Sequence, residues 1–115
     1  MTEFQRKFDQ AVIKIVSQIT AGQVLSYGEV ARMAGFPRHA RMVSQAMSRS
    51  PKPLPWFRVV RSNRTLAFTP GSGAYRKQAQ LLLADGVSIV DGKVIPLVTD
   101  QAKTLDELLW SEPYE

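Results

Sequence analysis

The chain has 115 residues and a formal net charge of +5, a length that fits one domain with its own hydrophobic core. It contains no cysteine and a single histidine, His39, which excludes disulfides and thiolate nucleophiles and argues against a zinc site. No apolar run approaches the roughly 18 residues that a membrane-spanning helix needs, and the polar first residues do not resemble a secretory signal. We therefore expect one domain over residues 1–115, monomeric and cytoplasmic, with no membrane partner, metal or cofactor.

The positive charge is concentrated in the middle of the chain. Residues 30–84 contain no Asp or Glu, while the rest of the chain holds all ten acidic residues and only five basic ones. Such segregation is typical of proteins that bind a polyanion, although a solvated basic surface is the plainer alternative. The basic residues of this acid-free stretch are Arg32, Arg38, Arg41, Arg49, Lys52, Arg58, Arg61, Arg64, Arg76 and Lys77.

Two helices are predicted in the first third of the chain. Apolar residues at helical spacing indicate a helix over residues 3–20, with Thr2 as its N-cap. Ser26 and Glu29 have the spacing of a capping box, so a second helix is expected to begin there. Gly35 is placed to end that helix as a C′ glycine.

A third helix is expected to begin at or near Pro37, because proline favours the first turn of a helix. Ala40, Val43 and Met47 would form its buried side. Two short helices joined by a glycine-containing turn, the second with a basic outer face, predict a helix-turn-helix whose second helix enters a DNA groove. The residues expected to face the groove are Ala40, Arg41, Met42, Gln45 and Arg49.

The second half of the chain combines short strands with a further helix. Three prolines in alternate positions forbid a helix over residues 51–55, and Asp91-Gly92 favours a type I′ hairpin turn. The expected class is mainly α with small β elements, a winged-helix-like helix-turn-helix domain. The expected elements are a strand at 56–60 paired with 65–68, a loop at 69–73, a helix at 74–84, a hairpin of 87–90 with 93–98, and a helix near 100–110.

Three strings, at residues 26–31, 40–47 and 55–60, resemble in order and spacing the DNA-binding domain of O6-alkylguanine–DNA alkyltransferases, and the resemblance covers residues 4–90. In the transferases the third string carries the cysteine that accepts the alkyl group and the histidine that activates it. Trp56 and Phe57 occupy these positions here, and the tryptophan makes the chain similar to alkyltransferase-like proteins. Asp85 stands where the transferases have the glutamate that orients the histidine.

The resemblance implies a non-enzymatic sensor of DNA damage. Its relatives bind O6-alkylguanine in duplex DNA, flip it into a pocket and direct the lesion to nucleotide excision repair. The residue chemistry agrees, because alkyl transfer needs a soft anionic nucleophile beside a base, and the Trp56 indole is neither.

Two residues are expected, by resemblance, to extrude the base. Arg41 would enter the base stack from the minor groove as an arginine finger. Tyr27 would push the neighbouring phosphate and form one side of the pocket. From the residues alone, a surface arginine and a half-buried tyrosine are equally ordinary readings, and Trp56 could line the pocket or fill the core. The full set expected around the lesion is Tyr27, Pro55, Trp56, Phe57, Arg58, Val59, Thr69, Gly71 and Ser72.

Three other functions stay open at this stage. A helix-turn-helix transcription regulator would share the basic face but would prefer one operator sequence. A glycosylase would need a well-placed acid or lysine near the pocket, and no acidic residue lies between Glu29 and Asp85. A pure protein-interaction module would not require the segregated charge.

Overall fold

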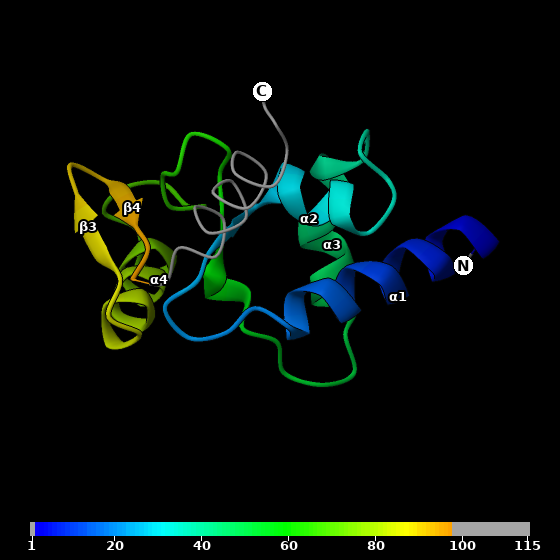
Figure 1. Cartoon of the computed structure of the whole chain (residues 1–115), viewed down its shortest axis with the longest axis horizontal. Coiled ribbons are helices and arrows are strands. Elements are labelled where there is room, and N and C mark those ends of the chain that lie inside the picture. Colours follow the sequence, from blue (N-terminus) through cyan, green and yellow to red (C-terminus); the bar gives the residue numbers. More distant parts are fainter. Residues whose placement is uncertain (1, 98–115) are drawn as a thin grey trace, which may run out of the picture.

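A computed structural model describes residues 2–97 and divides them into two groups of elements (Figure 1). Helices α1, α2 and α3 form one group, and α4 with the hairpin of β3 and β4 forms the other. The predicted mainly α class with small β elements is confirmed for this part of the chain. In chain order the elements are α1 (Glu3–Ser17), β1 (Leu25–Ser26), α2 (Tyr27–Met33), the 3-10 helix η1 (Ala40–Met42), α3 (Val43–Ser48), the 3-10 helix η2 (Trp56–Arg58), β2 (Val59–Val60), α4 (Gly73–Ala84), β3 (Ser88–Val90) and β4 (Lys93–Ile95).

The predicted helix signals hold for α1 and α2. The Thr2 hydroxyl accepts a hydrogen bond from the backbone of Gln5 at 3.0 Å, although α1 ends three residues earlier than expected, at Ser17. At α2 the capping box is complete, because Ser26 and Glu29 each accept a bond from the other's backbone N–H, at 3.1 and 2.7 Å. Both caps satisfy amides that would otherwise lack a partner in the first turn.

The predicted start of the third helix at Pro37 is wrong. The chain remains a loop through His39, η1 spans one turn, and regular α-helix begins only at Val43. Neither η1 nor α3 has a side-chain N-cap, so nothing in the loop supplies the hydrogen bonds that would start a helix earlier. Val43 and Ala46 form the buried side of α3, and Met47 is only partly buried.

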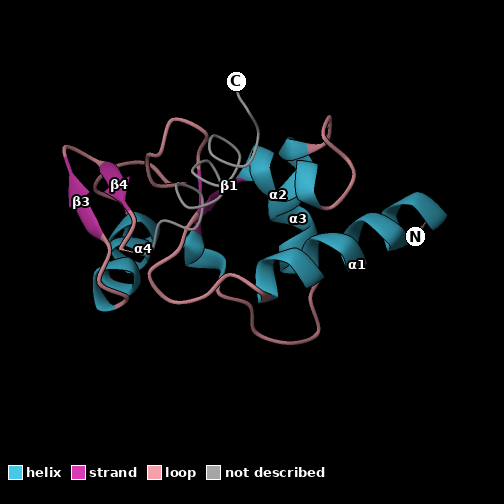
Figure 2. Cartoon of the chain, viewed as in Figure 1, coloured by secondary structure: helices cyan, strands magenta, loops and turns pink. Residues whose placement is uncertain are grey.

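A two-residue parallel pairing joins the two groups of elements. Leu25 and Ser26 of β1 lie opposite Val59 and Val60 of β2, and β1 lies between the two groups (Figure 2). The predicted strand at 56–60 is therefore correct only at its end, because η2 occupies Trp56–Arg58. Since neighbouring side chains on a strand point in opposite directions, Val59 enters one core and Val60 the other.

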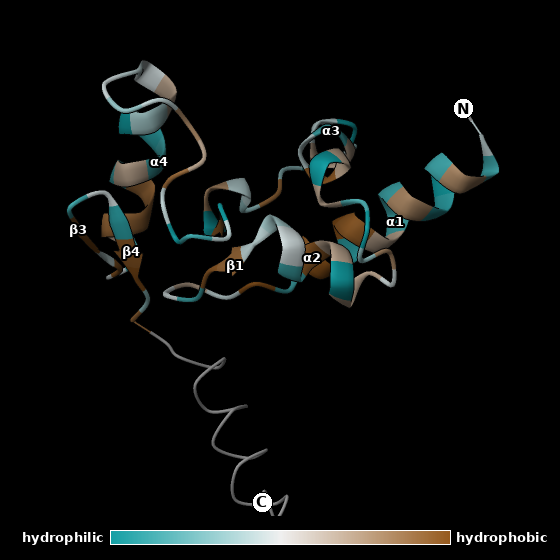
Figure 3. Cartoon of the chain, turned by 90° about the horizontal axis from the view of Figure 1, so that it is seen from above, coloured by the Kyte–Doolittle hydropathy of each residue, from teal (hydrophilic) through white to brown (hydrophobic). Residues whose placement is uncertain are grey.

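Each group of elements has its own buried core. Figure 3 shows apolar segments where α4 approaches the hairpin and on the inner parts of α1 and α2. The first core contains Phe8, Val12, Val16, Ile19, Val30, Ala31, Val43, Ala46 and Val59. The second contains Val24, Val60, Leu66, Leu82, Val87 and Val94.

The hairpin has the predicted turn but an unpredicted partner. Asp91 and Gly92 have φ values of 52° and 77°, as a type I′ turn requires. Thr65 bridges to Lys93 of β4, so the predicted pairing of 65–68 with 56–60 is wrong. The helix expected near 100–110 lies outside the described residues. Among residues 2–97 no helix combines the length and apolar character needed to cross a membrane.

The buried Gln78 ties α4 to the chain around β2. Its side-chain amide donates to the carbonyls of Phe57 and Val59 at 3.1 and 3.0 Å and accepts from the backbone of Ala67 at 2.9 Å. A fully buried amide with these partners incurs little cost of unsatisfied polar groups. It also fixes the segment that follows Trp56 against α4.

Candidate nucleic-acid interface

A surface cavity of about 570 Å³ lies between the start of α2, η1 and the turn that follows β2. Three separate parts of the chain build it, and it brings together three predicted functional residues, Tyr27, Ala40 and Arg41. The cavity is lined by Tyr27, Gly28, Ala40, Arg41, Ser44, Arg61, Ser62 and Asn63.

The β1–β2 pairing explains why Tyr27 and the turn after β2 line the same cavity. Ser26 and Val60 are partners in a parallel ladder, so the chains continue in the same direction from this pair. The next residues, Tyr27 and Arg61, therefore leave the ladder on the same side, and both line the cavity.

Tyr27 is more than half buried, and its hydroxyl is protonated at neutral pH. Burial raises the pKa of Tyr27 above its ordinary value, and the positive charge of Arg61 acts in the opposite direction without cancelling the effect. A protonated phenol can donate a hydrogen bond to an acceptor in the cavity.

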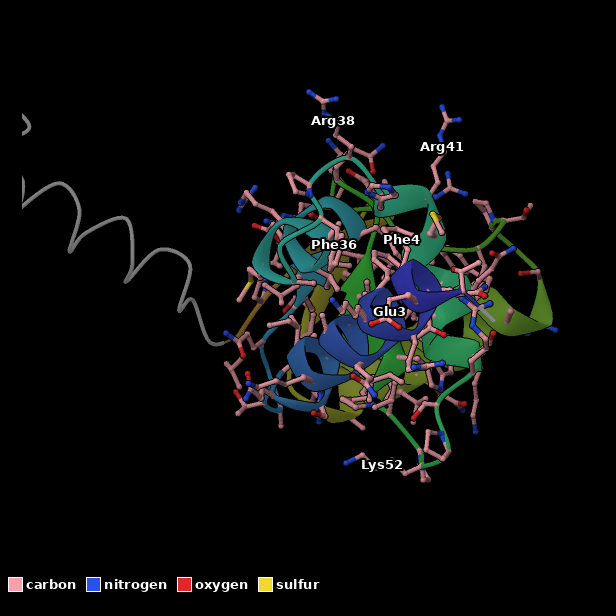
Figure 4. The ribbon with its side chains drawn as sticks, turned by 90° about the vertical axis from the view of Figure 1, so that its right-hand side faces the viewer. Glu3, Phe4, Phe36, Arg38, Arg41 and Lys52 are labelled. Atoms are coloured by element: carbon pink, nitrogen blue, oxygen red, sulfur yellow. The ribbon has the colours of Figure 1, made fainter. Side chains whose placement is uncertain are left out.

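Arg41 and Arg38 project into solvent from the same end of the molecule, whereas Lys52 lies at the opposite end (Figure 4). Arg41 and Gln45 are exposed, and Met42 is partly buried. Within residues 2–97, none of the ion pairs involves Arg38 or Arg41. Their charges are therefore available to a polyanion.

Three other arginines of the acid-free stretch, Arg49, Arg58 and Arg64, form ion pairs with carboxylates from outside the stretch. Arg64 binds both carboxylate oxygens of Glu29, each at 3.1 Å. Arg58 binds both oxygens of Asp85 at 2.8 and 3.1 Å and also donates to the carbonyl of Ile19 at 2.9 Å. The pKa of Asp85 lies below its ordinary value, chiefly because of the Arg58 hydrogen bonds.

Arg49, which the sequence predicts to face a DNA groove, forms an ion pair with Asp9 in the structure. Its Nε and Nη2 atoms lie 2.6 and 2.9 Å from the two carboxylate oxygens of Asp9 on α1. This two-point contact engages the guanidinium within the protein. Arg49 thus joins α3 to α1 instead of presenting a free charge.

Of the nine residues predicted to surround the lesion, Tyr27 lines this cavity and the other eight lie outside it. The Trp56 ring packs edge-on against Phe57 and Phe68, with ring centres 5.8 and 6.0 Å apart, so it favours the packing interpretation. Val59 is fully buried.

The remaining predicted pocket residues have other structural roles. Pro55 precedes η2, and Arg58 binds Asp85. Thr69 is exposed beside the turn that contains Gly71, at a φ of 88°, and the Ser72 hydroxyl caps α4. None of them belongs to the cavity that contains Tyr27 and Arg41.

Sequence reasoning missed the second wall of the cavity, formed by Arg61, Ser62 and Asn63. The acid-free stretch included Arg61, but it was one of ten basic residues without a further distinguishing signal. The β1–β2 register brings this turn to α2, and a two-residue ladder leaves no hydrophobic periodicity to detect.

Residues 7–87 match the family model of the 6-O-methylguanine DNA methyltransferase DNA-binding domain, and the chain belongs to this family. Its relatives include the DNA base-flipping protein of Escherichia coli K12, 42% identical over 89 residues, which are 76% of this chain and 67% of that protein. Alkyltransferase-like protein 1 of Schizosaccharomyces pombe is 38% identical over 91 residues, 77% of this chain and 81% of that protein.

Solved structures agree with this assignment. The S. pombe Atl1 complex with damaged DNA containing O6-carboxymethylguanine matches with a TM-score of 0.64 and 31% identity, over 84% of this chain and 93% of that one. Mycobacterium tuberculosis OGT in complex with DNA matches with a TM-score of 0.53 and 30% identity, over 74% of this chain and 50% of that one. The fold is the helix-turn-helix-like DNA-binding domain of this family, and the chain resembles its alkyltransferase-like members.

Proposed function

We propose that this protein binds O6-alkylguanine in duplex DNA, holds the nucleotide outside the base stack and leaves it chemically unchanged. The observation that carries the proposal is the cavity that Tyr27 and Arg41 line together. Arg41 and the exposed Arg38 project from the same end of the molecule. The relatives, which include a DNA base-flipping protein and an Atl1 bound to damaged DNA, support the same interpretation.

Arg41 is the residue assigned to fill the gap that the extruded base leaves. Extrusion costs a few kcal/mol of stacking and pairing energy, which an inserted side chain offsets. Arg41 stands at the rim of the cavity and is exposed. A side chain so placed can enter the duplex while the displaced nucleotide occupies the adjacent cavity beside Tyr27.

The absence of transfer chemistry follows from the side chains present. The chain has no cysteine, and the family resemblance aligns Trp56 and Phe57 with the nucleophile and its activating histidine. Neither ring can accept an alkyl group under mild conditions, because neither forms a nucleophilic anion. The bound lesion would then pass to nucleotide excision repair, with the protein acting as a cytoplasmic monomer of one domain.

A binding experiment on two matched duplexes tests the proposal. One duplex carries guanine and the other O6-methylguanine at the same position, at one salt concentration, and the DNA is recovered afterwards. We expect a preference for the lesion, unaltered DNA, and a roughly hundredfold loss of lesion affinity on Arg41→Ala, of the order of the extrusion cost. Lys52→Ala at the opposite end is the matched control and should leave the preference intact.

Three outcomes would contradict the proposal. Equal affinity of the wild-type protein for both duplexes would remove the sensor role. A preference for one sequence without a preference for the lesion would favour a transcription regulator. Recovery of dealkylated or base-free DNA would establish an enzyme.

A further inference from the structure

The cavity has a second arginine, Arg61, on the wall opposite the recognition segment. The arginines on either side of it in sequence are held by carboxylates, since Arg58 binds Asp85 and Arg64 binds Glu29. Among residues 2–97 the Arg61 side chain makes one long hydrogen bond, from its Nη2 to the carbonyl of Ala67 at 3.4 Å, and it is exposed. Arg61 therefore retains most of its hydrogen-bond donors for a ligand.

The backbone that carries Arg61 is held firmly in place. Its N–H donates to Thr65 at 3.0 Å, and its carbonyl accepts from Arg64 at 2.8 Å. The Asn63 side chain closes the turn by accepting from the N–H and hydroxyl of Thr65 at 3.1 and 2.7 Å. A side chain on so constrained a turn loses less entropy when it binds than one on a free loop.

The same turn is fastened to both groups of elements. Arg64, at a φ of 69°, binds Glu29 of α2 through its side chain and Val94 of β4 through its carbonyl. Burial opposes ionisation of Glu29, but its hydrogen bonds from Arg64 and Ser26 outweigh this and hold its pKa below the ordinary value. The clamp on α2 is therefore charged at neutral pH and sets the position of Arg61 relative to Tyr27.

The donors on this side of the cavity suit an acceptor-only group. Arg61 presents N–H groups, and the protonated Tyr27 and Ser62 present hydroxyls. Phosphate oxygens accept hydrogen bonds and carry negative charge, and a guanidinium binds them with matched geometry. The Tyr27 and Ser62 hydroxyls can donate to or accept from either a base or a phosphate, but a neutral nucleobase carries no charge to pair with the Arg61 guanidinium.

We propose that Arg61 binds the phosphodiester adjacent to the nucleotide in the cavity and acts as a second DNA-binding arginine opposite Arg41. This assignment rests on the proposed function, because the occupant of the cavity is the extruded nucleotide. Arg41 fills the vacated stack, while Arg61 holds the displaced backbone. The two arginines thus bind two different parts of the same distorted DNA.

The experiment compares Arg61→Gln with Lys52→Gln, which removes the same charge at the opposite end of the molecule. Affinity is measured against salt concentration on the lesion and the unmodified duplex. Each lost phosphate contact lowers the slope of log affinity against log salt by about 0.9. We expect that change, with roughly tenfold weaker lesion binding, for Arg61→Gln only, and partial recovery in Arg61→Lys.

Neutral methylphosphonates, placed one at a time around the lesion, then locate the contact. The effect of Arg61→Gln should disappear when one of the two phosphates flanking the lesion is neutral, and should persist for the others. Because Arg61 is exposed, the midpoint of urea unfolding should not change, which separates a DNA contact from a structural role.

Two outcomes distinguish this inference from the proposed function. A wild-type protein without lesion preference would overturn the proposed function and, with it, the occupant assumed here. A wild-type protein with lesion preference, whose Arg61→Gln variant keeps the parental salt slope and methylphosphonate profile, would overturn only the assignment of Arg61.

Discussion

Two sets of arginines come from the same acid-free stretch but lie in different environments. The paired set, Arg49, Arg58 and Arg64, binds carboxylates, whereas the exposed set, Arg38, Arg41 and Arg61, forms none of the ion pairs within residues 2–97. All three carboxylates, from Asp9, Glu29 and Asp85, come from outside the stretch. The charge segregation in the sequence therefore provides internal ion pairs with one set and, under the proposed function, DNA contacts with the other.

The two sets should respond differently to the same substitution. Removing one partner of a buried ion pair leaves the other charge without compensation, so the paired set should control folding. Removing an exposed arginine leaves nothing buried and should control binding and its salt dependence. Three further variants test this division, beginning with the largest expected effect.

Arg58→Ala should lower the free energy of unfolding by about 3–5 kcal/mol, the usual cost of breaking a buried ion pair. Only 17% of the Arg58 side chain and 11% of the Asp85 side chain are exposed, so water cannot replace the lost bonds. Urea unfolding measures the change. The double variant Arg58→Met with Asp85→Leu should recover much of the lost free energy of unfolding. If Arg58→Ala lowered that free energy by less than about 1 kcal/mol, the idea that the paired arginines control folding would be contradicted.

Acidification should destabilise the protein in part through Asp85. Its pKa is lowered in the folded state by Arg58, so its contribution is present above the unfolded value of about 3.9 and disappears as the pH falls through the folded value. Asp85→Asn should be less stable at neutral pH and should lose less stability below about pH 4. If the stability of the wild-type protein and of Asp85→Asn changed with pH in parallel, the Arg58–Asp85 pair would not contribute to the pH dependence.

Arg38→Ala should have the smallest effect, a loss of a few-fold in affinity that is equal for lesion and unmodified duplex. Arg38 is exposed at the same end as Arg41 but does not line the cavity, so we expect a sequence-independent phosphate contact. Fluorescence anisotropy at several salt concentrations would detect it. A selective loss on the lesion duplex would instead place Arg38 in recognition of the extruded base.

Local signals in the sequence predicted local structure well. The Ser26–Glu29 capping box and the Asp91-Gly92 turn depend on residues within one turn of each other, and both are confirmed. The predicted helix start at Pro37 is wrong, because proline tolerates a first turn without supplying the cap that begins one.

The candidate site depended on contacts between distant parts of the chain. The Tyr27–Arg61 neighbourhood follows from a pairing of residues more than 30 positions apart, and the role of Arg49 follows from Asp9, 40 positions away. Family resemblance pointed to Tyr27 and Arg41, which do share a cavity. It also pointed to residues around Trp56, whose ring packs edge-on against Phe57 and Phe68 and does not line this cavity.

The origin of the three carboxylates limits how this domain can be engineered. A peptide copied from residues 30–84 would contain every basic residue of the stretch and none of the acids that bind Arg49, Arg58 and Arg64. Such a graft would carry excess positive charge, repel itself and attach to nucleic acid without discrimination. A transfer of the proposed DNA-binding surface to another scaffold would therefore need to include Asp9, Glu29 and Asp85 together with the arginines that they bind.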